Sequence, residues 1–185
     1  MTKLRILLSV LMLLSFWALA QKQRRDPLTE PEIDKLRDTA QEPEQRLKLY
    51  IEFARARLDK LQQVHTGTKA DDREQQTRST LQDFVDVYDE LADNVDTFAD
   101  RGDDLRKALK PVIEADTEFG SKLRAFKSSL AASAKEASDD EFLLGSALEA
   151  VDAGAKDHRD LLAEQEETFK HKRKQEHSAN ARRGE

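Results

Sequence analysis

A row of acidic side chains in the middle of the chain could bind cations. Its members recur every three or four residues, a spacing that places them along one side of an α-helix. This acidic stripe consists of Asp83, Asp86, Glu90, Asp93, Asp96, Asp100 and Asp104. Like charges at these spacings repel by roughly a few tenths of a kcal/mol per pair, so divalent cations or a basic partner would relieve the repulsion. A solvated helix face is the simpler interpretation, because single-sign surfaces are common on soluble helices.

A second charged group lies at the C-terminal end of the chain. Residues 170–185 contain six bases, two acids and almost nothing apolar. The bases are Lys170, Lys172, Arg173, Lys174, Arg182 and Arg183. This composition predicts disorder beyond a helix end near Lys174, because it cannot offset the entropy of ordering. The charges could attach the chain to lipid headgroups or to an acidic envelope polymer. Alternatively, the segment is a solvated terminus whose first bases complement a helix dipole.

Metal-binding and catalytic motifs are missing from the sequence. Di-iron sites in helical bundles use Glu-x-x-His, and none of the four histidines has Glu three residues before it. Glu167 and His171 form one pair at i and i+4, which is a weak signal for zinc. His158 lies on an apolar helix face and is predicted to be a core or boundary histidine with one hydrogen bond. With no Gly-x-Ser-x-Gly, no Gly-rich phosphate loop and no cysteine, we expect no enzymatic activity and no cofactor.

The N-terminus has the pattern of an export signal. Lys3 and Arg5 precede an apolar run over residues 6–20 that ends in Ala18-Leu19-Ala20, which predicts cleavage before Gln21. The run is shorter than the roughly 20 residues that span a bilayer. An uncleaved anchor followed by a basic stop-transfer cluster is the alternative. We therefore expect a periplasmic or secreted protein with no transmembrane span after cleavage.

The mature chain would be acidic and free of cysteine. Without Lys3 and Arg5 it has 29 Lys and Arg against 37 Asp and Glu, a net charge of −8. Its stability must come from helix packing, because no disulfide can form. An acidic body argues against nucleic acid as a partner.

An apolar seam organises residues 81–130. One set of seam residues recurs every seven positions and comprises Phe84, Leu91, Phe98, Leu105, Val112, Phe119 and Phe126. The interleaved set comprises Leu81, Tyr88, Val95, Leu109, Leu123 and Leu130. Such a heptad pattern must be hidden against other helices. Gly102 and Asp116 interrupt it.

Capping and turn signals divide the first part of the chain into helices. Thr29 and Glu32 have capping-box spacing, which predicts a short helix to about residue 40. A longer helix over 43–65 follows and is stopped by Gly67. Its four bases are expected to pack beside the acidic stripe and set the order of the helices. They are Arg46, Lys48, Arg55 and Arg57.

The second part of the chain is predicted to form three helices. Gly102 favours helices over 71–101 and 103–134, although the unchanged heptad phase would also suit one long helix. Pro111 could kink the second of these helices. A capping box at Ser138 opens a last helix through about residue 170. Glycines inside these helical patterns mark close packing or local weakness. They are Gly120, Gly145 and Gly154.

These elements predict an all-α fold, an antiparallel helical bundle or an elongated coiled-coil-like stack of about four helices with a short N-terminal helix. The expected parts are a signal peptide (1–20), a polar segment with the short helix (21–41), the bundle (42–169) and the basic tail (170–185). We expect a non-catalytic exported protein that binds another protein or an anionic envelope surface through its helices, as a scaffold, adaptor or holdase-like module. A divalent-cation-binding protein using the acidic stripe is the alternative, and an enzyme is a more distant one.

Overall fold

The computed structural model describes residues 26–67, 70–132 and 139–183, and within them every regular element is a helix. The helices are α2 (Glu30–Arg37), α3 (Pro43–Gly67), α4 (Ala70–Asp100), α5 (Leu109–Ala132) and α6 (Asp139–Arg183). The predicted signal peptide and the capping residue Ser138 lie outside the described residues. None of the described helices combines the length and the apolar character that crossing a bilayer requires.

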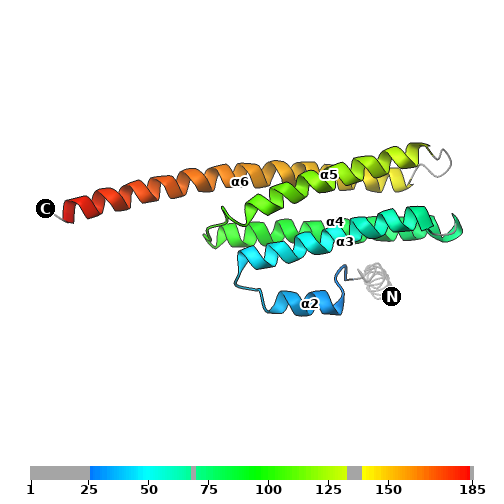
Figure 1. Cartoon of the computed structure of the whole chain (residues 1–185), viewed down its shortest axis with the longest axis horizontal. Coiled ribbons are helices and arrows are strands. Elements are labelled where there is room, and N and C mark those ends of the chain that lie inside the picture. Colours follow the sequence, from blue (N-terminus) through cyan, green and yellow to red (C-terminus); the bar gives the residue numbers. More distant parts are fainter. Residues whose placement is uncertain (1–25, 68–69, 133–138, 184–185) are drawn as a thin grey trace, which may run out of the picture.

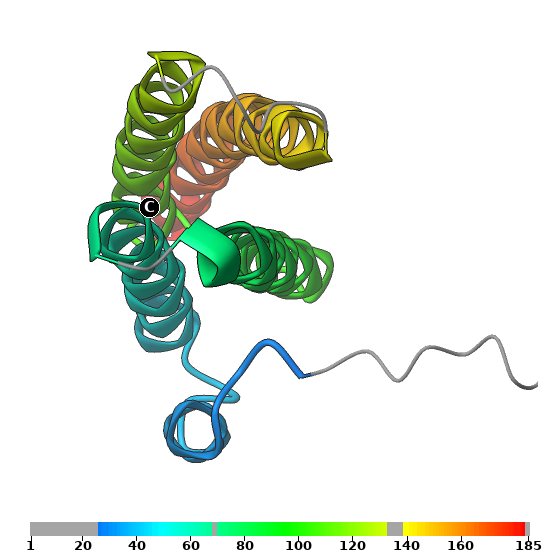
Figure 2. The same ribbon diagram turned by 90° about the vertical axis from the view of Figure 1, so that its right-hand side faces the viewer.

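The four long helices form a bundle, and α2 lies outside it against α3 (Figures 1 and 2). Consecutive helices from α3 to α6 alternate in direction (Figure 1). In cross-section, α3 and α6 each lie beside both α4 and α5, so α4 and α5 occupy one diagonal. The prediction of an all-α bundle is therefore confirmed.

The diagonal arrangement gives the bundle two parallel helix pairs. Arg55 of α3 bonds to Glu118 of α5, and one turn later Asp59 accepts from Lys122. These pairs advance together along both helices, so α3 and α5 run in the same direction. α4 and α6 are the other parallel pair (Figure 1).

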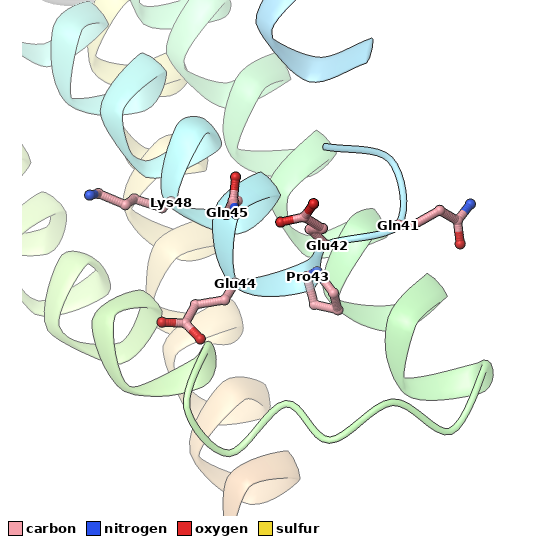
Figure 3. A pocket seen from close by; sticks show the side chains of 6 residues that line it. All are labelled: Gln41, Glu42, Pro43, Glu44, Gln45 and Lys48. Carbon is pink, nitrogen blue, oxygen red and sulfur yellow. The ribbon is translucent and has the colours of Figure 1, made fainter. Parts of the chain in front are cut away.

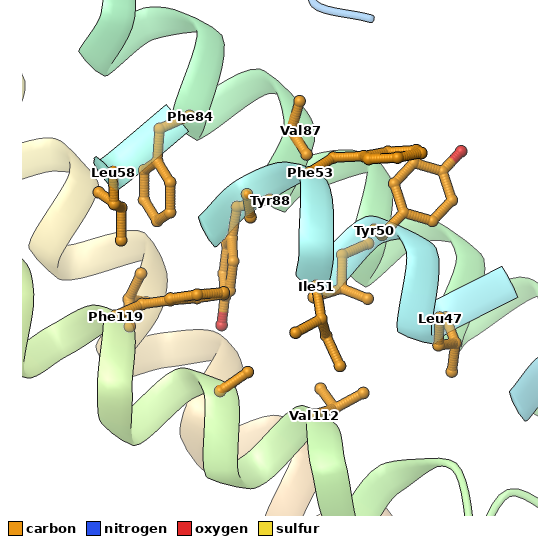
Figure 4. Packing of buried hydrophobic residues seen from close by; sticks show 14 of the residues in the cluster. Leu47, Tyr50, Ile51, Phe53, Leu58, Phe84, Val87, Tyr88, Val112 and Phe119 are labelled. Atoms are coloured by element: carbon orange, nitrogen blue, oxygen red, sulfur yellow. The ribbon is translucent and has the colours of Figure 1, made fainter. Parts of the chain in front are cut away.

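The core is built from the heptad seam together with the apolar faces of α3 and α6. All predicted seam residues are buried except Leu130, which is partly buried against the core. Figure 4 shows Phe84 and Tyr88 of α4 meeting Phe119 of α5 across the centre of the bundle. Phe84 and Phe119 pack edge to face, with ring centroids 5.7 Å apart. The diagonally opposed helices α4 and α5 thus contact each other through large aromatic side chains.

Gly102 marks the reversal between α4 and α5, as predicted. It has φ +82°, a left-handed conformation that glycine adopts without a steric penalty. Its N–H donates to the carbonyl of Ala99, and the N–H of Asp103 donates to that of Phe98, the pair of bonds that defines a Schellman motif. α5 begins only at Leu109, six residues later than predicted. Pro111 therefore lies in its first turn, where the missing N–H breaks no helical hydrogen bond.

The bases of α3 do not order the bundle through the acidic stripe, which corrects our expectation. Arg55 pairs with Glu118 in α5, and Arg57 bonds to Glu32 and to the carbonyl oxygen of Pro27, which ties α2 to α3. The Glu32 hydrogen bond raises the pKa of Arg57, and Asp83 of the stripe adds a smaller electrostatic contribution. Arg55 and Arg57 thus pair mainly with acids of α5 and α2, and not with the acidic stripe.

α6 is longer than predicted, because it continues to Arg183 instead of ending near residue 170. Its last part projects beyond the other helices in Figure 1. The structure differs from the prediction of disorder beyond Lys174, because residues 175–183 are helical. Lys, Arg, Gln, Glu and Ala all favour helix, and the first glycine or proline after Phe169 is Gly184. A polar composition alone did not distinguish a solvated helix from a disordered chain.

Candidate functional site

Three buried polar side chains meet in the core and link three helices. The hydroxyl of Tyr88 in α4 donates to Oδ1 of Asp116 in α5 across 2.7 Å. Nδ1 of His158 in α6 lies 2.9 Å from Oδ2 of the same carboxylate. The side chains of Asp116 and His158 are 0% and 4% exposed. We call Tyr88, Asp116 and His158 the buried cluster.

The heptad pattern explains how these residues reach one another. Tyr88 and Asp116 occupy equivalent seam positions four heptads apart, and the turn at Gly102 folds them onto facing sides of the bundle. Gly154 leaves room for the phenol, because a Cβ at this position would lie closer than 3.0 Å to the Tyr88 hydroxyl oxygen. The glycine inside α6 is therefore a place of close packing, one of the two roles that the sequence allowed.

In the buried cluster both carboxylate oxygens of Asp116 have a hydrogen-bond partner. Burial, followed by the charge of Asp116 and the hydrogen bond to it, raises the pKa of Tyr88 above its ordinary value of 10.0, so its hydroxyl remains a donor. An isolated buried carboxylate would cost several kcal/mol, roughly, and two hydrogen-bond partners reduce that cost. Among the described residues no Ser, Thr or Cys is hydrogen-bonded to His158. The arrangement resembles an acid–histidine pair in composition but offers no nucleophile.

A groove of about 270 Å³ lies next to the buried cluster, between α4 and α6. His158 lines it, so its ring separates Asp116 from the groove. Two members of the acidic stripe, Asp96 and Asp100, line the groove from α4, and Asp157 lines it from α6. We call this hollow the α4/α6 groove.

The acidic stripe does not form a single binding surface. Asp96 and Asp100 face α6 at the α4/α6 groove, whereas Asp83 contributes to the electrostatics of Arg57 on α3. Asp86 accepts a hydrogen bond from Gln82. Glu90 and Asp93 are exposed, and Asp104 lies in the turn, where it pairs with Arg106. The acidic side chains of the stripe thus have different neighbours and do not converge on one ligand position.

The described residues provide no metal site. No group of three or more His, Cys, Asp or Glu side chains in residues 26–67, 70–132 and 139–183 is placed to hold a metal ion. Glu167 instead lies between Lys170, at 3.2 Å, and His171, at 3.8 Å. The Glu167 and His171 spacing therefore belongs to a small surface ion cluster.

Another surface hollow lies at the start of α3, and the polar side chains that line it do not converge on a common point (Figure 3). It is lined by Gln41, Glu42, Pro43, Glu44, Gln45 and Lys48. Figure 3 shows their polar side chains fanning away from one another. A ligand in this hollow would therefore contact few of these side chains at once.

The basic residues of the tail lie on the projecting end of α6. Contacts with the bundle continue to Phe169, whose ring lies under the guanidinium of Arg106, 4.3 Å from its carbon. Beyond it, the side chains of Lys170, His171 and Arg173 are exposed. We call residues 170–183 the basic end of α6; its helix also carries Lys172, Lys174, Arg182 and Arg183.

Comparison with known proteins found no matching family model, no matching curated protein and no matching solved structure. The functional argument therefore depends on the geometry of this chain.

Sequence reasoning found His158 as a core or boundary histidine with one hydrogen bond, and the structure confirms it. It did not find the buried cluster or the α4/α6 groove. Asp116 was the available signal, because a carboxylate that interrupts an apolar seam needs a buried partner. The identity of that partner depends on which helices are neighbours, and heptad spacing does not specify this.

Proposed function

We propose that this chain is a non-catalytic exported protein that acts by binding a partner through its helix surfaces, as a scaffold, adaptor or holdase-like module. In this proposal the basic end of α6 attaches the protein to an anionic surface. The observation that supports it most directly is that the end of α6 projects past the other helices in Figure 1. The side chains of Lys170, His171 and Arg173 are exposed there.

The charge of the basic end supports an anionic partner. Six bases and one acid lie between residues 170 and 183. Each base near an anionic lipid surface contributes about 1 kcal/mol, so several together give measurable binding that salt weakens. The non-catalytic part of the proposal draws support from the buried cluster, whose carboxylate no substrate can reach.

Co-sedimentation with vesicles tests the attachment. We expect the full chain to sediment with anionic phospholipid vesicles or with an acidic polymer at low salt and to stay in the supernatant at high salt. A full-length variant with all six bases of the basic end replaced by Gln should not sediment. The matched control replaces six exposed lysines of the bundle region with Gln, namely Lys35, Lys48, Lys60, Lys107, Lys110 and Lys127. Equal binding by both variants, or no binding by the full chain, would refute the attachment.

Intact mass spectrometry of exported protein tests the processing step. Cleavage before Gln21 is expected from the apolar run and the Ala18-Leu19-Ala20 site. Recovery of an uncleaved chain in the membrane fraction would overturn the cleavage and leave the uncleaved anchor as the interpretation.

A further inference from the structure

The α4/α6 groove is lined by acidic side chains from two helices. They are Asp96 and Asp100 of α4 and Asp157 of α6, and no Lys or Arg lines the groove. None of the three has an ion-pair partner among the residues that the structure describes. The groove therefore carries uncompensated negative charge.

His158 is an independent sign that the groove receives a hydrogen-bond donor. Its side chain is only 4% exposed, yet it lines the groove. Asp116 engages Nδ1, and Nε2 has no hydrogen-bond partner within the described part of the chain. Because Asp116 engages Nδ1, Nε2 is the ring nitrogen left for a partner in the groove. In the tautomer with the proton on Nδ1, Nε2 is an acceptor that suits the N–H groups of Lys or Arg.

The chain itself carries a helix with the complementary charge. The basic end of α6 is 14 residues long, which corresponds to roughly 20 Å at 1.5 Å per residue. The part of α6 that lines the groove, residues 154–161, is shorter than this. The basic end is thus long enough to cover the groove of a second copy.

The order of charges along α6 suits an antiparallel pairing of two copies. A two-fold axis beside Phe169 sets residues 171–174 of one copy against residues 164–167 of the other. The first stretch reads His-Lys-Arg-Lys and the second Glu-Gln-Glu-Glu. The same axis sets residues 177–183, which end in Arg182 and Arg183, against residues 155–161, where Asp157 and His158 line the groove. Opposite charges therefore meet where residues 171–174 overlap residues 164–167, whereas Arg182 falls opposite Lys156, one residue from Asp157.

We propose that the α4/α6 groove receives the basic end of α6 from a second copy of this chain, giving a two-fold symmetric dimer. The two contacts are identical by symmetry, so the assembly closes at two copies and does not extend into a filament. The inference rests on the proposed function in that the same basic end is the binding element, and it names the acidic surface of a second copy as a partner.

Sedimentation velocity of the full chain tests the dimer. We expect twice the chain mass at low salt and the single-chain mass at high salt, because the contact is largely ionic. Replacing Asp96, Asp100 and Asp157 with Asn should weaken the association constant about tenfold or more, since the grooves of both copies lose their carboxylates. The matched control replaces Glu44, Glu52 and Glu114 with Gln, three exposed acids on the α3 and α5 side of the bundle, and should leave association unchanged.

A charge swap distinguishes a direct contact from a structural effect. The triple substitution Asp96→Lys, Asp100→Lys and Asp157→Lys should abolish the dimer, and so should Arg182→Glu with Arg183→Glu. Both sets in one chain should restore it, while circular dichroism confirms that each variant is helical. A single-chain mass at low salt would overturn the inference, as would a dimer that neither salt nor the groove variants weaken. A chain that stays monomeric yet binds anionic vesicles refutes the dimer alone. A dimer that binds neither vesicles nor acidic polymer refutes the attachment alone.

Discussion

The hydroxyl of Tyr88 fills the space that a side chain at Gly154 would need. A Cβ at position 154 would lie closer than 3.0 Å to the hydroxyl oxygen and 3.1 Å from two ring carbons. The phenol cannot move aside freely, because it is buried and donates to Asp116. The hydrogen bond between Tyr88 of α4 and Asp116 of α5 thus holds the phenol where only glycine fits at position 154 of α6.

Gly154→Ala should destabilise the protein although alanine is the better helix former. We expect the steric conflict to cost about 1–3 kcal/mol of unfolding free energy, more than the roughly 1 kcal/mol gained in helix propensity. Gly145→Ala, in the same helix with nothing within 4 Å of its Cβ, should stabilise the protein. Chemical denaturation followed by circular dichroism measures both. Stabilisation by both substitutions would show that Tyr88 does not occupy this space.

Removing the Tyr88 hydroxyl should leave Asp116 with one buried acceptor unpaired. Tyr88→Phe is expected to lower the free energy of unfolding by about 1–3 kcal/mol. Tyr50→Phe is the comparison, because the Tyr50 hydroxyl interacts with Asn94 and lies 3.5 Å from the Arg46 guanidinium, and it does not bond to a buried carboxylate. If the two substitutions had equal small effects in denaturant titrations, the buried cluster would not contribute as described.

Truncating a seam phenylalanine should cost far more than truncating an exposed one. Phe98 is 2% exposed, whereas Phe142 at the start of α6 is 78% exposed. Phe98→Ala should lower stability by about 3–5 kcal/mol, and Phe142→Ala by less than about 0.5. Urea denaturation of both variants gives the comparison. A small loss for Phe98→Ala would contradict the packing of α4 in the bundle.

The pair between Arg55 and Glu118 should make stability depend on pH in the acid range. The hydrogen bonds from Arg55 hold the pKa of Glu118 below its ordinary value of 4.5. A lowered folded-state pKa adds stability above about pH 4.5, and that stability is lost as the pH falls through the folded-state value. Glu118→Gln should therefore destabilise the protein at neutral pH and change little in strong acid.

Glu114→Gln, one turn earlier on α5, is the control for the pH series, because Glu114 has no ion pair among the described residues. Thermal unfolding of the three proteins across the acid range measures the difference. A Glu118→Gln effect that is the same at every pH would contradict the role of the ion pair.

Local signals predicted much of the fold because their partners lie close in sequence. Thr29 and Glu32 form the expected capping interaction, in which the Thr29 N–H donates to the carboxylate at 2.8 Å. Gly102 ends α4 because its backbone conformation is a local property. The seam residues are buried because a heptad pattern specifies which face is hidden.

Features that depend on which helices are neighbours were not predictable in the same way. Arg55 could have met an acid on any adjacent helix, and it pairs with Glu118 instead of the acidic stripe. Asp116 and His158 were each recognisable as buried polar groups, but their contact follows from α5 and α6 being adjacent. The missed length of α6 has another cause, since helix propensity outweighed polarity beyond Phe169.

The turn between α4 and α5 also determines how the molecule can come apart. It joins two hairpins, α3 with α4 and α5 with α6, and these meet through parallel contacts such as Arg55 with Glu118. Each hairpin needs only short-range chain closure, whereas docking one on the other brings together residues about sixty positions apart. We therefore expect residues 101–108 to act as a hinge when the two hairpins separate. Opening there exposes two complementary apolar faces, the geometry from which domain swapping begins.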